Sequence, residues 1–480
     1  MKILLISPPL KNMARYQMRS RGCMPPLNLL YLAAALRAAG HEAALLDLYA
    51  RPMPLPELLK AVEQHSPGAV GFASYTANIE EVYALAAAIK AARPSVTTIV
   101  GGIHASYLPE IALACPALDV AVIGEGERTI AELAGALAAG RPLDGVAGLA
   151  FRKDGAVVRT PARPGVGDIN ALPWPAWDLA DFGDYYLAST RAVTDRPAAS
   201  VLTMRGCAYS CAFCSHSFCY PEVKPRDPGD VVDEIEFLHR ERGVGEFQFE
   251  DSTFTCLPGR ALKICELIKR RGLDIVWSCN IRADNMTEEL FAAMSGAGCR
   301  RVLLGVEAGT QRMLDAMKKG ITLDQVRRTV AWAKRHGVRV NAAFMIGAPG
   351  ETRESAWAAY RFALELDTDY VMFSSLVPSV GSDYFDLAVS QKKVDPATVK
   401  GADYITVYAE KTPLAQMSEL GRSELAALME RFTRGYYLRP RYVLKRLLGL
   451  RSLNEAAGML AGFTLVVSHQ LGDLRRRAGI

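Results

Sequence analysis

Three closely spaced cysteines are the residues of this chain whose pattern most clearly predicts chemistry. Cys207, Cys211 and Cys214 are separated by three and then two residues, directly after the apolar run 200–204. Thiolates hold iron–sulfur clusters, and a four-iron cubane normally takes four of them. Three thiolates in one loop would leave one iron open to a ligand that is not protein. Such an iron can bind and reduce a small molecule.

On spacing alone, two other interpretations of these cysteines stay open. A zinc site usually has four Cys or His ligands, and His216 and Cys219 are near enough in sequence to complete one. Unligated thiols are also common, because a free Cys in an apolar stretch behaves as a small hydrophobe. Four of the ten cysteines lie in such stretches: Cys115, Cys265, Cys279 and Cys299. A disulfide framework is disfavoured in a chain of this length without a secretion signal.

Length and composition indicate a multidomain globular protein. The 480 residues exceed what one core usually needs, so two or three domains are expected. The formal net charge of +5 is small and the charges are interleaved, which argues against a nucleic-acid partner. The first apolar run is short and breaks at prolines, and no run of about 18 apolar residues occurs. We therefore expect a cytoplasmic protein whose thiols stay reduced.

Residues 1–143 alternate short apolar strands with helical patterns. The strands are expected at 3–6, 43–48, 69–73, 97–100 and 120–123, and the helices at 27–39, 58–63, 82–92 and 129–138. This order predicts an α/β domain with a doubly wound, Rossmann-like parallel sheet. Ligands of such sheets bind at the carboxyl ends of the strands. The candidate residues in the loops at that edge are Ser7, Pro8, Ser74, Tyr75, Gly101, Gly102, His104, Gly124, Glu125, Gly126 and Glu127.

A linker and a second α/β domain follow. Residues 144–198 are rich in proline, carry a small hairpin around Asp154-Gly155, and are expected to be tied down by Trp174 and Trp177. Residues 199–378 then show six strands, at 200–204, 246–250, 275–280, 301–305, 338–346 and 370–376. Six strand–helix units predict a partial (β/α)6 barrel, with its chemistry at the carboxyl ends of the strands. The cysteine loop follows the first strand, at that end.

The cysteine motif, with Phe213 before its last thiol, resembles the signature of radical S-adenosylmethionine enzymes. The stretches 249–254, 305–309 and 347–351 extend the resemblance over nearly the whole chain to the cobalamin-dependent subgroup. That subgroup contains the anaerobic magnesium-protoporphyrin monomethyl ester cyclase. The resemblance implies a 4Fe–4S cluster on the three cysteines, S-adenosylmethionine on the fourth iron, and reductive cleavage of its sulfonium.

The resemblance also implies which residues at the barrel mouth hold S-adenosylmethionine. By position, Glu250 or Asp251 would meet the amino group and Glu307 the methionyl or ribose part. Glycines in 345–350 would pack against adenine. The complete set of candidates at the mouth is Glu250, Asp251, Asn280, Arg282, Glu307, Gly347 and Gly350.

In the first domain, the resemblance points to cobalamin at the segments 101–104 and 124–127. One departure from other cobalamin proteins is clear. Their Asp-x-His-x-x-Gly loop is missing after the first strand, where Ser7-Pro8-Pro9 stands, and His104 lies after a later strand. We therefore expect cobalt without a protein histidine below it. No G-x-G-x-x-G follows the first strand, so a nicotinamide cofactor is not favoured.

The remaining residues, 379–480, are expected to form a helical cap over the barrel. Their basic and aromatic part at 434–451, followed by the apolar segment 456–467, could alternatively touch an anionic membrane surface. For the whole chain, the first expectation is methylation of an unactivated carbon of a small or lipid-like substrate, fed by a low-potential donor such as flavodoxin or ferredoxin. The second is oxidative cyclisation or rearrangement with the same cofactors. The third is a non-catalytic iron–sulfur or zinc module.

Overall fold

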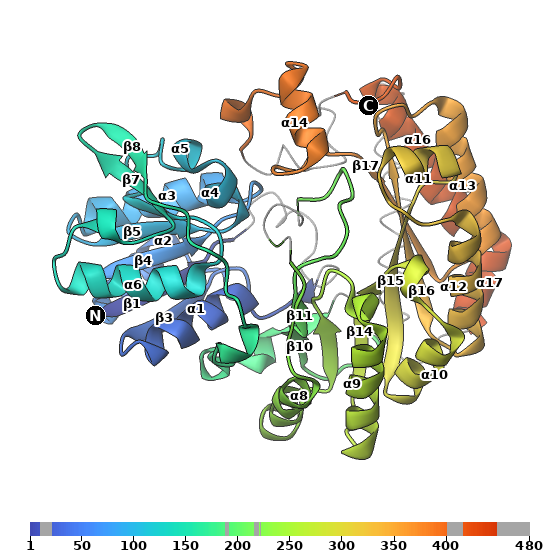
Figure 1. The fold of residues 1–480 in the computed structure, drawn as a ribbon, viewed down its shortest axis with the longest axis horizontal. Coiled ribbons are helices and arrows are strands. Elements are labelled where there is room, and N and C mark those ends of the chain that lie inside the picture. Colours follow the sequence, from blue (N-terminus) through green and yellow to red (C-terminus); the bar gives the residue numbers. More distant parts are fainter. Residues whose placement is uncertain (10–21, 188–191, 216–219, 221, 401–415, 449–480) are drawn as a thin grey trace.

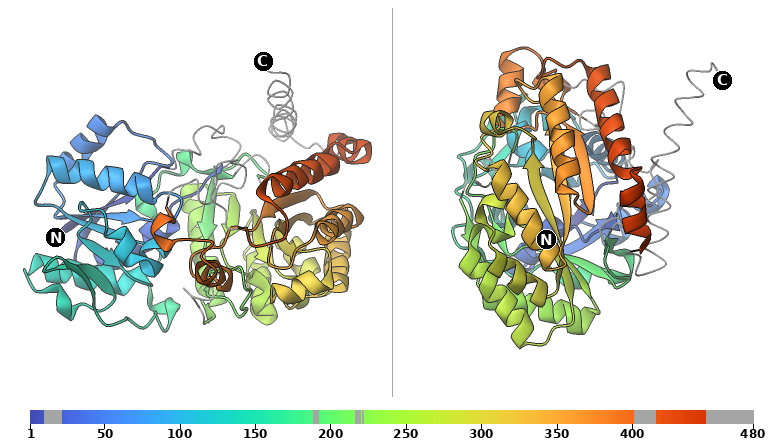
Figure 2. Two further views of the ribbon diagram at one scale, coloured as in Figure 1. Left: turned by 90° about the horizontal axis from the view of Figure 1, so that it is seen from above. Right: turned by 90° about the vertical axis from the view of Figure 1, so that its right-hand side faces the viewer.

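The computed structural model describes residues 1–9, 22–187, 192–215, 220, 222–400 and 416–448. Two lobes lie side by side, one built from the first domain and one from the six-stranded barrel (Figure 1). The view from above keeps the same arrangement, with the linker running between the lobes (Figure 2).

The first lobe is a seven-stranded sheet in the order β3-β1-β4-β5-β6-β7-β8. Its parallel strands are β1 (Lys2–Ser7), β3 (Glu42–Asp47), β4 (Ala69–Ala73), β5 (Thr97–Gly101) and β6 (Val120–Val122). The expected hairpin is present as β7 (Leu149–Lys153) and β8 (Ala156–Arg159), and it extends the sheet because β7 pairs antiparallel with β6.

Helices cover both faces of this sheet, so the central strands are buried on each side. All five residues of β4 are buried, as expected for a strand in a doubly wound sheet. The main helices are α1 (Leu27–Ala38), α2 (Leu55–His65), α3 (Ile79–Ala92) and α6 (Gly126–Ala138). Two separate hydrophobic clusters result, one containing Ile3 and Leu5 and the other containing Leu4 and Ile6. The predicted fold of this domain is confirmed.

The second lobe is an open sheet of six parallel strands, which confirms the partial barrel. In sheet order they are β10 (Ala198–Val201), β13 (Glu246–Phe249), β14 (Val276–Ile281), β15 (Cys299–Glu307), β16 (Arg339–Ile346) and β17 (Tyr370–Ser375). The helices between them include α8 (Pro228–Arg242), α9 (Pro258–Arg270), α10 (Glu288–Gly296), α11 (Gln311–Ala316), α12 (Leu323–Arg335) and α13 (Arg353–Leu366).

Local sequence explains where these helices begin. The Asp227 side chain accepts hydrogen bonds from the N–H groups of Gly229 and Asp230 at the start of α8. Thr322 and Gln325 form a capping box at the start of α12. Each cap satisfies backbone donors that the first helical turn would otherwise leave unpaired.

Three helices follow the barrel among the described residues of the C-terminal region. They are α14 (Asp383–Ser390), α16 (Arg422–Tyr437) and α17 (Pro440–Leu448). In α16, Phe432 and Tyr436 are fully buried, and the Phe432 ring lies 5.5 Å from that of Phe373 in β17. The predicted apolar segment 456–467 and the arginines at 475–477 lie outside the described residues. Within the described chain, the structure has no helix long and apolar enough to cross a bilayer.

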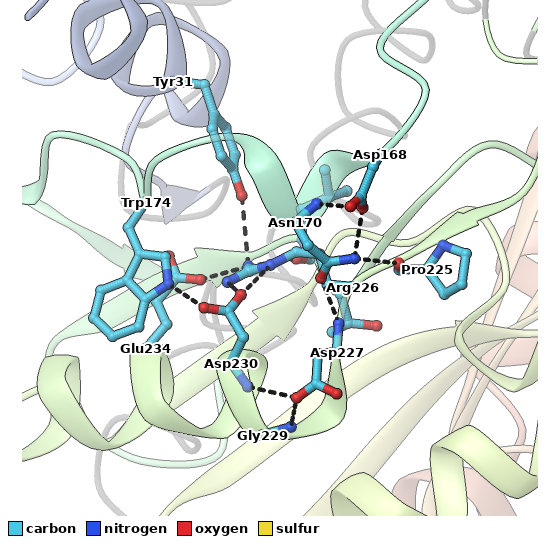
Figure 3. Close-up of polar contacts among 12 residues, drawn as sticks. Tyr31, Asp168, Asn170, Trp174, Pro225, Arg226, Asp227, Gly229, Asp230 and Glu234 are labelled. Atoms are coloured by element: carbon cyan, nitrogen blue, oxygen red, sulfur yellow. Dashed lines mark hydrogen bonds and ion pairs between the residues drawn. The ribbon is translucent and has the colours of Figure 1, made fainter. Parts of the chain in front are cut away.

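The linker is fixed to the barrel by buried polar contacts around Arg226 (Figure 3). Arg226 binds Asp230 and Glu234 of α8, each at 2.5 Å. The indole of Trp174 donates to Asp230 at 2.7 Å, and that of Trp177 donates to Glu234 at 2.8 Å. The two tryptophans therefore do tie the linker down, as the sequence predicted.

Candidate functional site: a cluster loop facing the edge of the first sheet

The three cysteines lie on the loop between two short strands, β11 (Met204–Arg205) and β12 (Lys224–Pro225), at the carboxyl end of β10. We call this loop the cluster loop. The two strands pair antiparallel and close its base. Gly206 has a φ of +93°, and a Cβ there would come 1.8 Å from the carbonyl oxygen of Glu222, so only glycine fits. The loop therefore folds back tightly before its first thiol.

The backbone between the thiols is held from two sides. The N–H of Ala212 donates to the carbonyl of Met317 at 3.0 Å, and the carbonyl of Ala212 accepts from Tyr384 of α14 at 3.0 Å. A turn closes the segment, with the N–H of Cys214 donating to the carbonyl of Cys211 at 3.0 Å. The thiol positions are thus set by backbone bonds.

The donor set fits a cubane cluster. All three cysteines are free thiols; Cys211 is buried, and Cys207 and Cys214 are half-buried. Over the part of the chain that is described, no three His, Cys, Asp or Glu side chains converge as a single ion requires. A cubane makes a different demand, because each thiolate binds its own iron. His216 and Cys219, the candidates for a zinc site, lie outside the described residues.

Arg282 places a positive charge beside one thiol. Its Nη1 lies 3.5 Å from Sγ of Cys211, and its guanidinium lies 3.5 Å from the ring centroid of Tyr209. Asp284 accepts two hydrogen bonds from it, at 3.1 Å each. The guanidinium therefore lies directly against the buried thiol of the motif. Arg282 is among the residues predicted for the site, whereas this contact and Tyr209 are not.

Glu307 is paired with a lysine that the sequence analysis missed. Lys319 Nζ lies 2.8 Å from Oε1 of Glu307, and both side chains are buried. The same ammonium lies 5.8 Å from the ring centroid of Phe213, inside the cysteine motif. Glu307 also has a φ of +68°, which is rare for a residue with a side chain. The positive φ coincides with an irregularity in the pairing of β15 with β16 between Gly305 and Glu307.

The two acidic residues after β13 have different surroundings. Asp251 is fully buried and accepts hydrogen bonds from Thr203 N at 2.7 Å, Met204 N at 2.8 Å and the Thr203 hydroxyl. Burial raises its pKa, and these bonds oppose the rise. Glu250 is exposed at the mouth, where Oε1 accepts from Ser200 at 2.9 Å. Of the pair, Glu250 is the one that faces the open mouth.

Asn280 and the glycine loop after β16 complete the mouth. Asn280 donates from Nδ2 to the carbonyl of Asp251 at 2.9 Å, so it fixes the end of the neighbouring strand. Gly347 and Gly350 have φ values of +90° and +78°. Glu351, the last residue of the stretch 347–351, is buried and accepts from Gly347 N at 3.2 Å and Ser355 Oγ at 2.6 Å. Burial raises the pKa of Glu351.

On the first lobe, the loops after β4 and β5 interlock. Ser74 binds the carbonyl of Gly101 through both its N–H, at 2.7 Å, and its hydroxyl, at 2.8 Å. Gly102 has a φ of +107°, and a Cβ there would lie 2.3 Å from the Ser74 carbonyl oxygen. Gly102 is therefore needed by the fold itself. After β1, Ser7 hydrogen-bonds Asp47 and Pro8 is buried.

His104 and Tyr75 differ from the other residues of this edge, His104 by a buried nitrogen without a partner and Tyr75 by its exposure. His104 is fully buried and its Nδ1 lies 3.3 Å from the Thr76 hydroxyl, but its Nε2 has no hydrogen-bond partner. Burial lowers the pKa of His104 to about 4, so the ring is neutral. Tyr75 is 52% exposed, yet burial and then Glu250 raise its pKa. Tyr75 therefore lies at the edge of the first sheet, close enough to Glu250 of the second lobe for that charge to act on it.

The loop after β6 has an open part and a closed part. A Cβ at Gly124 would meet no atom within 4 Å, so this side of the loop is open. Gly126 starts α6 and packs against Leu32. Glu125 and Glu127, in contrast, are buried and bind Arg205 of the opposite lobe. The loop after β6, where the sequence predicts cobalamin, therefore contacts the base of the cluster loop through Arg205. The sequence alone could not show this contact.

Comparisons with known proteins agree with this geometry. The B12 binding domain family matches residues 18–134, and the radical SAM superfamily matches residues 201–363. An uncharacterized methyltransferase of Pyrococcus horikoshii, PH0819, is 32% identical over 447 residues, which cover 93% of this chain and 94% of that protein. The anaerobic magnesium-protoporphyrin IX monomethyl ester cyclase of Rubrivivax gelatinosus is 30% identical over 373 residues, covering 76% and 66%.

A solved structure shares the whole fold. The methyltransferase TsrM of Kitasatospora setae, determined with tryptophan and a S-adenosylmethionine analogue, matches with a TM-score of 0.73 and 20% identity, covering 98% of this chain and 99% of that one. Fold and sequence together define a radical S-adenosylmethionine enzyme with a cobalamin-binding domain ahead of its barrel. The chain belongs to the family of the Pyrococcus methyltransferase and the anaerobic ester cyclase. The predicted family, fold and cofactor classes are confirmed.

Proposed function

We propose that this enzyme cleaves S-adenosylmethionine reductively at a 4Fe–4S cluster on Cys207, Cys211 and Cys214 and methylates an unactivated carbon. The main support is the meeting of the two loop sets: the cluster loop and the edge of the B12-type sheet face one space. Several relatives are named methyltransferases, including the cytidylyl-2-hydroxyethylphosphonate enzyme of Streptomyces wedmorensis, 28% identical, and the hopanoid C-3 methylase of Methylococcus capsulatus, 28% identical.

Different residues of the protein would hold the cluster loop and the cosubstrate. Arg282 contacts Sγ of Cys211, and the backbone bonds of Ala212 hold the loop between the thiols. Glu250, at the exposed mouth, accepts hydrogen bonds in a position to take the amino group of the cosubstrate. When bound, the reduced cluster supplies the electron that cleaves S-adenosylmethionine, and cobalamin carries the methyl group.

The fit of cobalamin rests on the first lobe. The fully buried His104 has an Nε2 without a partner, and a Cβ at Gly124 would meet no atom within 4 Å. A corrin periphery carries amide groups that can satisfy such a nitrogen. His104 follows β5 and not β1, so we keep the prediction that it is not a cobalt ligand. The residues that would hold the cofactor are Ser74, Tyr75, Gly101, Gly102, His104 and Gly124.

The substrate is expected to enter the same space from the barrel side. Met372 of β17 is 49% exposed although it lies in the middle of a strand, because its face of the sheet looks into the barrel. An apolar side chain at this place suits a small organic or lipid-like molecule, and a flavodoxin or ferredoxin would supply the electron. We place the enzyme in the cytoplasm.

Product analysis after anaerobic reconstitution tests this proposal. Methylation yields S-adenosylhomocysteine together with 5′-deoxyadenosine, whereas cyclisation yields 5′-deoxyadenosine alone. The Cys207→Ala variant should lose the cluster and all cleavage. Zinc in the purified protein, with no cleavage by the wild type, would contradict the proposal and support a binding module.

Oxidative cyclisation or rearrangement is the second candidate function. It is favoured by the identity of 30% to the anaerobic ester cyclase, close to the 32% of the Pyrococcus methyltransferase. The same product analysis separates the two.

A further inference from the structure

A buried ionic cluster joins the two lobes next to both cofactor loops. Nη1 of Arg205 lies 2.9 Å from Oε1 of Glu125, and Nη2 lies 2.7 Å from Oε1 of Glu127. The side chains are 10%, 5% and 8% exposed. Arg205 precedes Cys207 by two residues, and the two glutamates flank the start of α6. One guanidinium therefore bridges the loop that carries the thiols and the loop after β6.

The other end of the cluster loop holds the same carboxylate. Lys224 is the register partner of Arg205 in the β11–β12 ribbon, and its Nζ lies 3.5 Å from Oε2 of Glu125. The N–H of Val166 in the linker also donates to this oxygen. Both strands that enclose the cluster loop are thus attached to one residue of the first lobe.

On the barrel side, the residues before Arg205 are equally fixed. Asp251 holds the backbone N–H groups of Thr203 and Met204, and Arg260 donates to the Thr203 hydroxyl at 3.0 Å. The chain from 203 to 205 is therefore clamped between the barrel and the first lobe. Movement of the cluster loop relative to the loop after β6 would break charged hydrogen bonds that are shielded from water.

We propose that Arg205 is a positioning residue that sets the distance between the cluster and the cobalamin. The inference rests on the proposed function, because it assumes that both cofactors bind at these loops. Transfer of a group between two bound partners is sensitive to their separation: a displacement of about 1 Å can slow a reaction by about 100-fold. Rigid attachment of the cluster loop to the loop after β6 would keep the separation of the two cofactors constant.

The test measures the distance between the cofactors without any substrate. The protein is reconstituted anaerobically with iron and sulfide, loaded with hydroxocobalamin and reduced, so that Co(II) and the cluster are both paramagnetic. The relaxation of the Co(II) electron-paramagnetic signal then reports the separation. The wild type should give one enhanced rate. In Arg205→Met the enhancement should be lost or spread over many rates, while the iron and cobalt contents stay at wild-type levels.

Two further variants keep the result interpretable. Arg205→Lys should recover part of the enhancement, since one ammonium cannot hold two carboxylates as a guanidinium does. If Arg205→Met does not fold, the triple change Arg205→Met, Glu125→Gln and Glu127→Gln also removes the two buried carboxylates that lose the guanidinium, and it should show the same loss. Arg37→Met is the matched control, because Arg37 also joins the first lobe to the linker, at Asp178, but far from both loops along an exposed surface.

The outcomes are distinct. Enhancement in Arg205→Met or in the triple variant equal to that in Arg37→Met would overturn the positioning role while leaving the proposed function intact. A wild type that binds no cobalamin or forms no cluster would overturn the proposed function, and the inference with it.

Discussion

The barrel mouth and the edge of the first sheet differ in whether their buried polar side chains have partners within the protein. At the mouth, Arg282, Glu307 and Lys319 are buried with ionic partners, and Asp251 is buried with backbone and hydroxyl donors. At the sheet edge, His104 keeps a buried nitrogen without a partner, and Tyr75 is 52% exposed. The mouth is therefore preorganised, whereas His104 at the sheet edge keeps a polar atom that the protein does not pair.

The adjacent lysines Lys318 and Lys319 offer the strongest test of preorganisation. Lys319→Met should lower the free energy of unfolding by about 3 kcal/mol, because it leaves the buried Glu307 carboxylate without its partner. Lys318→Met should change it by less than about 0.5 kcal/mol, since the Lys318–Asp383 pair is exposed. Chemical denaturation of the two apoproteins measures both values. Equal effects would show that the mouth is not a preorganised site.

The pH dependence of stability tests whether His104, at the edge of the first sheet, is held neutral in the folded protein. Burial holds the pKa of His104 at about 4, below the value of about 6.5 of an unfolded chain. A depressed pKa in the folded state means that the unfolded chain takes up the proton first as the pH falls. Stability from this residue is therefore complete above about pH 6.5 and lost toward pH 4. Between pH 7.5 and 5 the loss should be about 2 kcal/mol.

His104→Gln should remove this part of the pH dependence, and unfolding at a series of pH values checks it. His41→Gln, in a half-buried histidine near the chain start, is the matched control. An unchanged pH slope in His104→Gln would mean that the ring is not held neutral in the fold.

The smallest expected effect is on cobalamin affinity, and it comes from Tyr75 at the edge of the first sheet. Tyr75→Phe should weaken cobalamin binding by about threefold to tenfold, the equivalent of one hydrogen bond, because its side chain is exposed in the loop after β4, at the edge predicted to hold the cofactor. Its thermal stability should match that of the wild type, since the side chain is 52% exposed. Equilibrium titration with hydroxocobalamin gives the affinity. Unaltered affinity would place the cofactor away from this loop.

The sequence predicted the order of strands and helices in both lobes because hydrophobic periodicity and caps are local signals. The cysteine loop was found for the same reason, since its three thiols lie within eight residues. Lys319 was missed because an isolated charged residue after a helix has no local mark of burial. Its role follows from the partner that the fold supplies, Glu307.

Asp251 and the pair Glu125 and Glu127 show how far the position of a residue at the end of a strand predicts what it binds. Asp251 was expected to meet the cosubstrate, but its oxygens hold the backbone at 203–204. Glu125 and Glu127 were expected at the cobalamin, but Arg205, about 80 positions later in the chain, binds both. Being at the right end of a strand brings a residue to the site, and the residues opposite then decide what it binds. The cofactor-binding roles of these three residues stay predictions.

The most direct measurement of the central claim is the Mössbauer spectrum of the anaerobically reconstituted protein, with and without S-adenosylmethionine. Three thiolates on a four-iron cluster predict one iron that differs from the other three, and a spectrum that changes at that iron alone when S-adenosylmethionine is added. Four equivalent irons, unaffected by S-adenosylmethionine, would contradict the account.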